Sequence, residues 1–506
     1  MSGDLEVRTT AGVVRGVAVD GASGNGDLRA WRGIPYAAST AGEGRFRAPR
    51  PGEPWTGVRD ASAFGPVPPQ QRSRLAALGA GRRTPMGEDC LSVNVVAPAA
   101  PADRPRPVLV WIYGGAFSMG SSAVPGYAGH ELVRTGDVVY VSFNYRLGAL
   151  GFLDLTRYST PERPIETNLG IRDQVAALEW VRDNIAAFGG DPDNVTIFGE
   201  SAGGTSVTTL LTTPAARGLF HRAIAQSPAP GAAYLPERTA AWGAQLVGLL
   251  GAEEKDAARA LLGASADDLV AVGTALDEWA NQAAPGTLCF APVVDGEFLP
   301  AHPVDAGVTG ALHDVPLLIG TNDREATLFA RSGSTLLPTT RSLLDRLFAL
   351  TDPPAEQRVL AAYHGRGAVV DVAGDHAFWW PSVRVAEGHS AVAPTFMYRF
   401  DLAPRLLRLA GVDATHAAEM TLVFGEVDTL FVRALTALGG REAMRAVSAR
   451  MQAHWVHFAR HGTPLPDWPA YDVDQRRTLV FDEVDRVEAD PRADRRRAWT
   501  GFTDYR

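Results

Sequence analysis

The sequence predicts an α/β fold, with helices on both faces of a large, mostly parallel central sheet. Short apolar runs rich in β-branched residues alternate with stretches of helical spacing, and this alternation is typical of a parallel sheet covered by helices. The runs are also almost continuously apolar, as strands buried on both faces require. No internal repeat or interdomain linker is evident, so residues 1–506 are expected to form a single domain.

Seven runs are the clearest candidates for strands. They are Pro107–Tyr113, Val138–Asn144, Val195–Phe198, Arg222–Gln226, Val315–Gly320, Thr395–Phe400 and Thr478–Asp482. Between the second and the third, a helix is expected over Asn168–Phe188, because apolar residues recur on one face and two glycines follow it. Another helix should begin at Ser201 and end before Pro214. The region of about residues 326–410 is rich in helix formers apart from its strand, and it is expected to include a helical cap or lid.

The composition argues against several classes of function. With 46% hydrophobic and 21% charged residues, the chain has the makeup of an ordinary soluble globular protein. Its net charge of −9 argues against a nucleic-acid partner, because phosphate binding needs clustered surplus basic side chains. The one basic cluster, Arg492 with Arg495–Arg497, is interleaved with acidic residues and is expected to be a solvated tail segment. No run of about 18 apolar residues occurs, so no membrane span is expected.

The expected location of the protein is the cytoplasm. The start of the sequence, Met1–Arg8, lacks the basic and apolar regions of a secretory signal. The two cysteines, Cys90 and Cys289, could form at most one disulfide, and the sequence alone does not show that they approach each other. Free thiols are the default in a reducing compartment.

Ser201 is the candidate nucleophile. It lies in the run Gly199-Glu200-Ser201-Ala202-Gly203, directly after a predicted strand and directly before a predicted helix. A G-x-S-x-G nucleophile elbow needs this context, because its sharp turn leaves no room for side chains at the glycines and projects the serine hydroxyl above the sheet. The alternative is a Gly-Ser turn that matches by chance. We interpret the motif as the elbow of an α/β-hydrolase fold.

Acyl transfer also needs hydrogen-bond donors for the oxyanion that forms on the substrate. The run Trp111–Phe117 ends a predicted strand with small residues, which let the backbone approach a substrate closely. The N–H groups of Gly115, Ala116 and Ala202 are the expected donors, with Gly114 permitting the turn. A plain glycine turn is the alternative.

In this fold an acid and then a histidine follow the serine in chain order. Both are expected on loops beyond strand ends, because α/β sheets build their sites at the carboxyl ends of the strands. Seven of the eleven histidines come after Gly320, and chain order does not choose among them. They are His364, His376, His389, His416, His454, His457 and His461.

Motifs along nearly the whole chain make the sequence similar to the type-B carboxylesterase and cholinesterase family of α/β-hydrolases, especially its bacterial para-nitrobenzyl esterase branch. Besides the serine elbow, the motifs that carry this resemblance are Trp31–Ala37, Glu88–Val95, Asn144–Gly148, Trp455–Gly462 and Trp468–Tyr471. So many motifs in the right order are not a chance match.

The resemblance implies a Ser-His-Glu triad that works through an acyl-enzyme. The family's acid motif reads Gly320-Thr321-Asn322-Asp323-Arg324-Glu325 here, which indicates Glu325, and its histidine precedes a Val-Phe-Gly run, which indicates His416. The alternatives are Asp323 for the acid and His454, His457 and His461 for the base. Glu200 resembles the family's buried second carboxylate, and Ser227 resembles a hydroxyl that supports the triad; both residues are equally compatible with a packing role.

The sequence departs from the family pattern at several positions. Tyr113 stands where many members have histidine, and Ala116 where many have a third glycine, but backbone donation tolerates both. Ala326 replaces the glycine that usually follows the acid. Many secreted relatives bridge the equivalent of Cys90 to a cysteine a short way upstream, and residues 51–89 contain none.

The predicted function is hydrolysis of small to medium acyl or aromatic carboxylic esters, with no metal or organic cofactor. The expected partner is a small-molecule ester, and the protein is expected to be a monomer or a small homo-oligomer. Candidates for an apolar substrate pocket are Phe117, Leu288, Phe290, Phe329, Phe378, Trp379, Trp380 and Phe424. The alternatives are an amidase or thioesterase with the same triad, and a non-catalytic cholinesterase-like binding protein.

Overall fold

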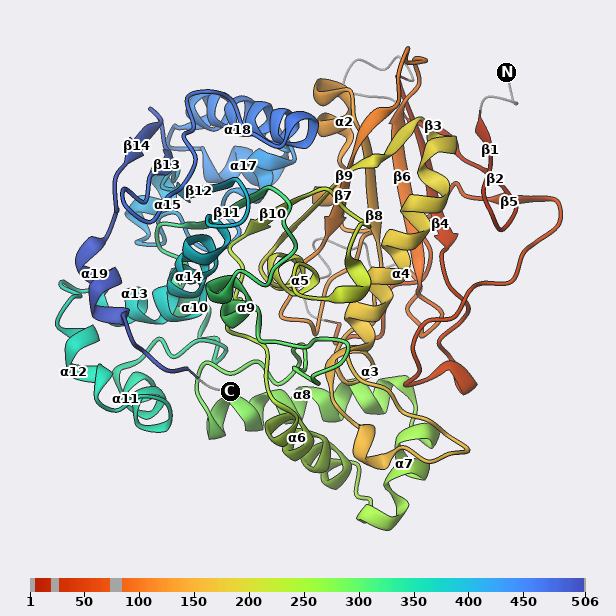
Figure 1. Ribbon diagram of the computed structural model, residues 1–506, viewed down its shortest axis with the longest axis horizontal. Helices are drawn as coiled ribbons and strands as arrows, with labels where there is room; N and C mark the ends of the chain where they lie inside the picture. The colour runs from red at the N-terminus through yellow and green to blue at the C-terminus, as the bar shows by residue number, and fades with distance from the viewer. Residues whose placement is uncertain (1–4, 20–26, 73–83, 505–506) are drawn as a thin grey trace.

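A mixed sheet of eleven strands forms the centre of the computed structural model, which describes residues 5–19, 27–72 and 84–504 (Figure 1). The strands lie in the order β14-β13-β12-β11-β10-β9-β7-β8-β6-β4-β3. Their bounds are β3 (Val17–Val19), β4 (Leu28–Pro35), β6 (Ser92–Pro98), β7 (Arg106–Ile112), β8 (Val139–Phe143), β9 (Gly190–Glu200), β10 (Arg222–Gln226), β11 (Leu317–Asn322), β12 (Thr395–Phe400), β13 (Thr478–Phe481) and β14 (Arg486–Glu488). A separate small sheet contains β1 (Glu6–Arg8), β2 (Val13–Arg15) and β5 (Val58–Asp60).

The seven strands from β8 to β13 along the sheet are parallel to one another. They are the seven strands that the sequence predicts, with shifted ends; β9, for example, begins earlier, at Gly190. The predicted fold class is therefore confirmed. The antiparallel strands at the two edges, β3, β4, β6 and β14, are not among the clearest candidates. In β4 the partly exposed Arg29 and Arg32 interrupt the apolar run, as expected of a strand that is not buried on both faces.

Helices cover both faces of the sheet, with α2 and α18 on one face and α4, α5 and α14 on the other (Figure 1). The helices before β11 are α2 (His130–Gly136), α3 (Ala149–Phe152), α4 (Leu169–Asn184), α5 (Ala202–Leu210), α6 (Pro236–Leu249), α7 (Ala257–Gly263), α8 (Ala266–Ala283) and α9 (Pro303–Thr309). Those after it are α10 (Thr327–Ser332), α11 (Arg341–Leu350), α12 (Ala355–Leu360), α13 (Ala368–Gly374), α14 (Trp380–His389), α15 (Arg405–Leu409), α16 (Met420–Val423), α17 (Leu430–Leu435), α18 (Arg441–His461) and α19 (Ala493–Trp499). A π-helical turn (Asp375–Trp379) joins α13 to α14.

Both helices expected next to the parallel strands are present. α4 and a short 3₁₀ turn after it, Ile185–Phe188, together span the helix expected over Asn168–Phe188. Gly189, at φ 85°, ends it, because a left-handed conformation is easy for glycine. α5 follows Ser201 and ends at Leu210, before the predicted break.

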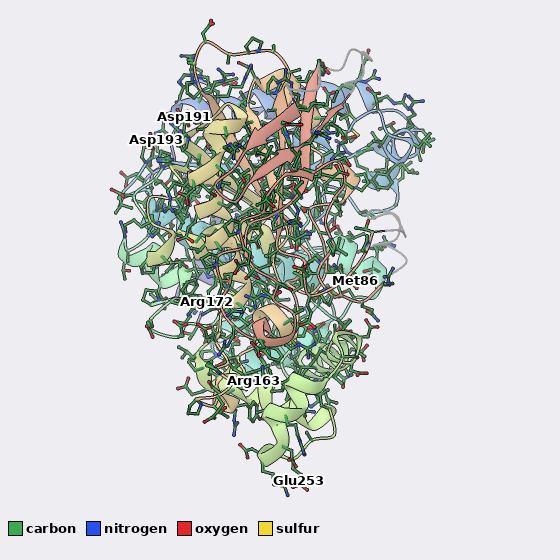
Figure 2. All side chains as sticks on the ribbon, turned by 90° about the vertical axis from the view of Figure 1, so that its right-hand side faces the viewer. Met86, Arg163, Arg172, Asp191, Asp193 and Glu253 are labelled. Carbon is green, nitrogen blue, oxygen red and sulfur yellow. The ribbon has the colours of Figure 1, made fainter. Side chains whose placement is uncertain are left out.

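Two groups of helices extend beyond the carboxyl ends of the parallel strands. α6 to α8 follow β10, and α10 to α13 follow β11 (Figure 1). In Figure 2, Asp191 and Asp193 at the start of β9 lie at one end of the molecule, and Glu253, between α6 and α7, lies at the other. The second group falls within the region where the sequence predicts a cap or lid, and that role stays a prediction.

The arginines near the C-terminus correct the expectation of a solvated tail segment. The Arg492 side chain is only 11% exposed and pairs with Asp323 at 2.6 Å and with Asp375 at 3.1 Å. Arg495 also pairs with Asp375, whereas Arg497 is 62% exposed. The sequence prediction was wrong because acidic side chains from distant segments meet these arginines only in the fold.

Three further expectations can be compared with the structure. Cys90 and Cys289 are both buried free thiols. Within the described ranges, no helix has the length and apolar character needed to cross a membrane. Of the start segment Met1–Arg8, the first four residues lie outside the described part of the chain.

Candidate active site

Ser201 lies in a strained turn between β9 and α5. It adopts φ 58° and ψ −124°, a conformation that L-residues rarely take and that clusters at functional sites. A Cβ on Gly199 would lie 2.5 Å from the carbonyl carbon of Gly203, and a Cβ on Gly203 would lie 2.0 Å from the Ile112 oxygen. Only glycine therefore fits on either side. The Ser201 N–H donates to the Gln226 oxygen at 3.0 Å, which holds the turn against β10.

The glycine turn after β7 packs directly against Ser201. A Cβ on Gly114 would lie 3.0 Å from the Cβ of Ser201 and 2.4 Å from the carbonyl oxygen of Glu200. Gly115 has φ 123° and Ala116 has φ 52°, so that the backbone here is also in the left-handed region. Ala116 and Ala202 line the same cavity as Ser201. Their role, with Gly115, as oxyanion donors stays a prediction.

Glu325 and His416 meet at the same end of the sheet. His416 Nδ1 lies 2.7 Å from Glu325 Oε2. Glu325 Oε1 accepts hydrogen bonds from Ser227 Oγ and from the Asn322 N–H, both at 2.7 Å. Both side chains are buried. The structure thus brings together the acid, the histidine and the supporting serine that the family resemblance indicates.

His416 also faces a second carboxylate, that of Glu200. His416 Nε2 lies 3.2 Å from Glu200 Oε1, and within the described part of the chain Nε2 has no hydrogen-bond partner. Burial lowers the pKa of the imidazole, but the charges of Glu200 and Glu325 outweigh it and raise the pKa of His416 to about 9. Burial raises the pKa of Glu200 to about 8. Both groups therefore hold a proton more tightly than they would in water.

The alternative acid has different partners. Asp323 Oδ1 pairs with Arg492 at 2.6 Å. Although burial opposes it, the guanidinium groups of Arg492 and Arg399 hold the pKa of Asp323 below its usual range. The alternative histidines lie on α18, and none of them lines the cavity that contains Ser201. They are His454, His457 and His461.

Glu419 is a buried carboxyl group beside this site that the sequence analysis does not single out. It accepts hydrogen bonds from Asn322 Nδ2 at 2.7 Å and from Gln226 Nε2 at 3.2 Å. Burial and the charge of Glu325 raise the pKa of Glu419. Its place shortly after His416, next to the apolar run that forms α16, is the one signal in the sequence that could have pointed to it.

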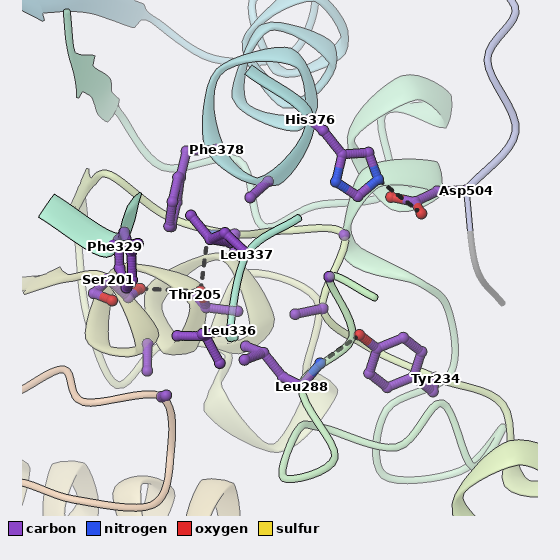
Figure 3. A pocket seen from close by; sticks show the side chains of 17 residues that line it. Ser201, Thr205, Tyr234, Leu288, Phe329, Leu336, Leu337, His376, Phe378 and Asp504 are labelled. Atoms are coloured by element: carbon purple, nitrogen blue, oxygen red, sulfur yellow. Dashed lines mark hydrogen bonds and ion pairs between the residues drawn. The ribbon is translucent and has the colours of Figure 1, made fainter. Parts of the chain in front are cut away.

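Ser201 borders a mainly apolar cavity with about 630 Å³ of empty space, part of it open to solvent (Figure 3). Three of the predicted pocket residues line it, Leu288, Phe329 and Phe378. The Phe378 ring stacks on the His416 imidazole with 4.5 Å between ring centres. Both helical groups beyond the sheet contribute to the lining, because Leu288 follows α8 and Phe329 lies on α10.

The other predicted pocket residues lie elsewhere in the described structure. Phe117 and Phe424 are packed in the core, where they contact Phe152 and Trp111 respectively. Phe290 borders a second hollow and Trp379 a third, while Trp380 packs in the core. The lining residues that the sequence analysis did not select as pocket residues include Thr205, Tyr234, Leu336, Leu337, His376 and Asp504. They come from separate loops and helices, and no local pattern marks them.

Comparison with known proteins gives a consistent result. Residues 3–499 match the model of a family described as the carboxylesterase family. The para-nitrobenzyl esterase of Bacillus subtilis is 39% identical over 97% of this chain and 97% of its own length, and the phenmedipham hydrolase of Pseudarthrobacter oxydans is 34% identical over 95% and 96%. A solved structure of a PNB esterase, 38% identical, superposes with a TM-score of 0.87 over 98% of this chain and 99% of that one.

Proposed function

The chain belongs to the carboxylesterase family and is a carboxylic ester hydrolase, and we propose that Ser201, His416 and Glu325 perform the hydrolysis through an acyl-enzyme. One observation carries the proposal. His416 contacts Glu325 at 2.7 Å through Nδ1, while Nε2 has no hydrogen-bond partner in the described part of the chain. Nε2 is thus available to the Ser201 hydroxyl, and catalytic hydrogen bonds often tighten only when substrate binds.

In the first half of the reaction, Ser201 Oγ attacks the carbonyl carbon of the ester and His416 Nε2 takes the serine proton. The carbonyl oxygen becomes an oxyanion, which accepts hydrogen bonds from the backbone N–H groups of Gly115, Ala116 and Ala202. His416 then gives the proton to the departing alcohol oxygen as the bond between that oxygen and the carbonyl carbon breaks. The acyl group remains bound to Ser201 Oγ.

In the second half, water takes the place of the alcohol. His416 removes a proton from the water as its oxygen attacks the acyl carbon, and the same N–H groups hold the new oxyanion. His416 returns the proton to Ser201 Oγ, the acyl–serine bond breaks and the carboxylic acid leaves. The enzyme is then ready for another ester.

The carboxylates around His416 support both halves of this cycle. Glu325, fixed by Ser227 and Asn322, orients the imidazole and stabilises its positive charge. Glu200, at 3.2 Å from Nε2, stabilises the same charge from the other side.

The lining of the cavity favours small to medium acyl esters or aromatic esters. Leu288, Phe329 and Phe378 offer it apolar and aromatic surface, and sites of this kind bind mainly through burial of apolar groups. An aromatic alcohol, such as the one in the name of the para-nitrobenzyl relative, suits such a surface. We further propose that the protein is a monomer or small homo-oligomer that acts in the cytoplasm of a bacterium. The two buried free thiols suit such a reducing compartment.

The experiment that tests the mechanism compares the wild type with Ser201→Ala on a chain-length series of para-nitrophenyl esters. Loss of a triad nucleophile should reduce kcat/KM by about 10⁴-fold or more. Ser206→Ala is a matched control, because Ser206 is also buried on α5 but donates its hydroxyl hydrogen bond to the Ala202 oxygen. If Ser201→Ala kept activity within about tenfold of the wild type, the mechanism would be wrong.

Titration with an organophosphate checks the nucleophile independently. The reagent should inactivate the enzyme with one label per chain, and peptide mass spectrometry should find that label on Ser201. A stoichiometric label on any other residue would contradict the assignment.

A further inference from the structure

At a distance from Ser201 the apolar cavity has a polar wall made by His376 and Asp504 (Figure 3). His376 Nε2 lies 3.2 Å from Asp504 Oδ1. The imidazole is buried, with a relative exposure of 4%. Leu288, Leu336 and Leu337 provide apolar lining in the same cavity. The middle of a bound ester would therefore contact apolar side chains, and the end of the ester far from Ser201 would lie near His376 and Asp504.

One nitrogen of His376 is left without a partner. Nδ1 is buried and has no hydrogen bond to any residue that the structure describes. In Figure 3 the edge of the ring that carries the nitrogens faces the cavity. A buried polar atom that makes no hydrogen bond costs free energy, which a ligand group placed opposite Nδ1 would relieve.

The surroundings hold the imidazole in one orientation. His376 belongs to the π-helical turn Asp375–Trp379, and such turns occur frequently at functional sites. The preceding Asp375 accepts hydrogen bonds from Tyr363 Oη at 2.7 Å and from Arg492 at 3.1 Å. The ring of Trp499 packs against the imidazole, with 5.9 Å between ring centres.

The partner of His376 also determines what its unpartnered nitrogen can do. An ionised aspartate only accepts hydrogen bonds, so that Nε2 must carry a hydrogen to bond with Asp504. In a neutral imidazole the hydrogen bond of one nitrogen fixes the state of the other. While the imidazole is neutral, Nδ1 is therefore a hydrogen-bond acceptor that faces the substrate cavity.

We propose that His376 is a specificity-determining residue that accepts a hydrogen bond from a hydroxyl or N–H group at the far end of the bound ester. Asp504 is a positioning residue, because it holds the tautomer in which Nδ1 accepts. The inference rests on the proposed function, in which Ser201 attacks an ester seated in this cavity. The preferred substrates are then hydroxyacyl esters, or monoesters of diols, with an apolar chain between the ester and the hydroxyl group.

The first test uses the wild-type protein alone. para-Nitrophenyl esters of ω-hydroxy acids are compared with esters in which a methyl group or a methoxy group replaces the hydroxyl, over a series of chain lengths. A matching series of hexanoate esters of diols and alcohols covers the other half of the substrate. At one chain length in one series, the hydroxyl compound should have a kcat/KM about three- to tenfold above both analogues.

The second test shows whether His376 causes that preference. His376→Phe keeps an aromatic ring without the acceptor and should remove the preference for the hydroxyl compound. His376→Asn keeps a polar group near the position of Nδ1 and should restore part of it. His389→Phe is the matched control, because His389 is also buried but its Nε2 contacts the Val315 oxygen at 2.9 Å outside the cavity. It should leave the ratio unchanged.

The outcomes separate this inference from the proposed function. Ser201→Ala should abolish hydrolysis of every ester in both series, whatever His376 does. No hydroxyl preference at any chain length, or the same preference in His376→Phe, would overturn the role of His376 while Ser201 remained the nucleophile. A methoxy compound as good as the hydroxyl compound would overturn the assignment of Nδ1 as acceptor.

Discussion

Glu325 is fixed on three sides by residues from different parts of the chain. Ser227 Oγ and the Asn322 N–H donate to one carboxylate oxygen, and His416 Nδ1 lies 2.7 Å from the other. Because a carboxylate only accepts, this contact keeps a hydrogen on Nδ1 of the neutral imidazole. Nε2 is then the nitrogen that can accept the proton of Ser201.

Glu200 should set the pH at which the enzyme becomes active. His416, the proposed base, can accept a proton only when neutral. Because nearby carboxylates raise its pKa, activity should fall as the pH falls through this raised value. Glu200→Gln removes one negative charge at 3.2 Å from Nε2. The pKa of His416 should therefore drop, and the acid limb of the profile of kcat/KM against pH should move to lower pH.

The measurement uses one para-nitrophenyl ester across the acid, neutral and alkaline range. Glu426→Gln is the control, because Glu426 is also partly buried but is not among the groups that shift the pKa of His416. An acid limb that stays in place, or moves to higher pH, in Glu200→Gln would argue against this electrostatic role.

Among the elements, the strand–turn–helix unit of β9, Ser201 and α5 depends most on its glycines. A Cβ on Gly203 would lie 2.0 Å from the Ile112 oxygen at the end of β7. To relieve this contact, the backbone at Gly203 would have to move, which displaces Ser201, or the backbone at Ile112 would have to move, which displaces the glycine turn after β7. The geometry of the proposed nucleophile and that of the expected oxyanion donors are thus coupled through one close contact.

We expect Gly203→Ala to lower kcat/KM by about 100-fold or more, because a displacement of Ser201 by about 1 Å can cost that much activity. The melting temperature should also fall, because overpacking of this kind typically costs about 1–3 kcal/mol. Gly248→Ala is the control, because Gly248 lies in α6 with open space around the new Cβ. It should leave activity unchanged and stability equal or slightly higher. Wild-type activity in Gly203→Ala would show that the elbow relaxes more easily than these distances suggest.

The strands also differ in how well their sequences predict them. β7 is buried along its whole length, and its continuous apolar run, Pro107–Ile112, is plain in the sequence. β4 and β14 lie toward the edges and carry partly or fully exposed charged side chains. An alternating or charged short run is equally compatible with a loop, so that only pairing with a neighbour makes it a strand.

At the scale of the whole molecule, the C-terminal segment ties distant parts of the chain together. Arg492, just before α19, pairs with Asp323 after β11 and with Asp375 in the π-helical turn. The same turn carries His376 and Phe378, which both line the cavity. The end of the chain therefore supports the position of the cavity wall.

Arg492→Leu should destabilise the protein by about 1–3 kcal/mol, because the charged hydrogen bonds to Asp323 and Asp375 are lost while Asp375 keeps its pair with Arg495. Thermal unfolding monitored by circular dichroism gives the measurement. In Arg497→Leu, by contrast, the lost pair with Asp494 is largely exposed, and the melting temperature should stay within about a degree. Equal melting temperatures for the two variants would contradict the structural role of Arg492.

Much of the site could be predicted from the sequence because its parts obey local rules. The elbow needs glycine at two positions around Ser201 whatever surrounds it. The part of β9 just before it, Val195–Phe198, is mostly apolar because it is buried on both faces. The acid and the histidine were harder, since the residues alone left seven histidines open. The family resemblance indicated Glu325 and His416, and these two lie 2.7 Å apart in the structure.

By itself, then, the sequence determined the fold class, the central strands and the position of the elbow, because each depends on short-range backbone geometry or on burial along a single segment. Only the tertiary structure decided which side chains meet. It brought Glu419 beside Asn322, paired Arg492 with two distant acids, and placed His376 and Asp504 in the same cavity as Ser201. Such contacts join residues far apart in the chain, and no local pattern encodes them.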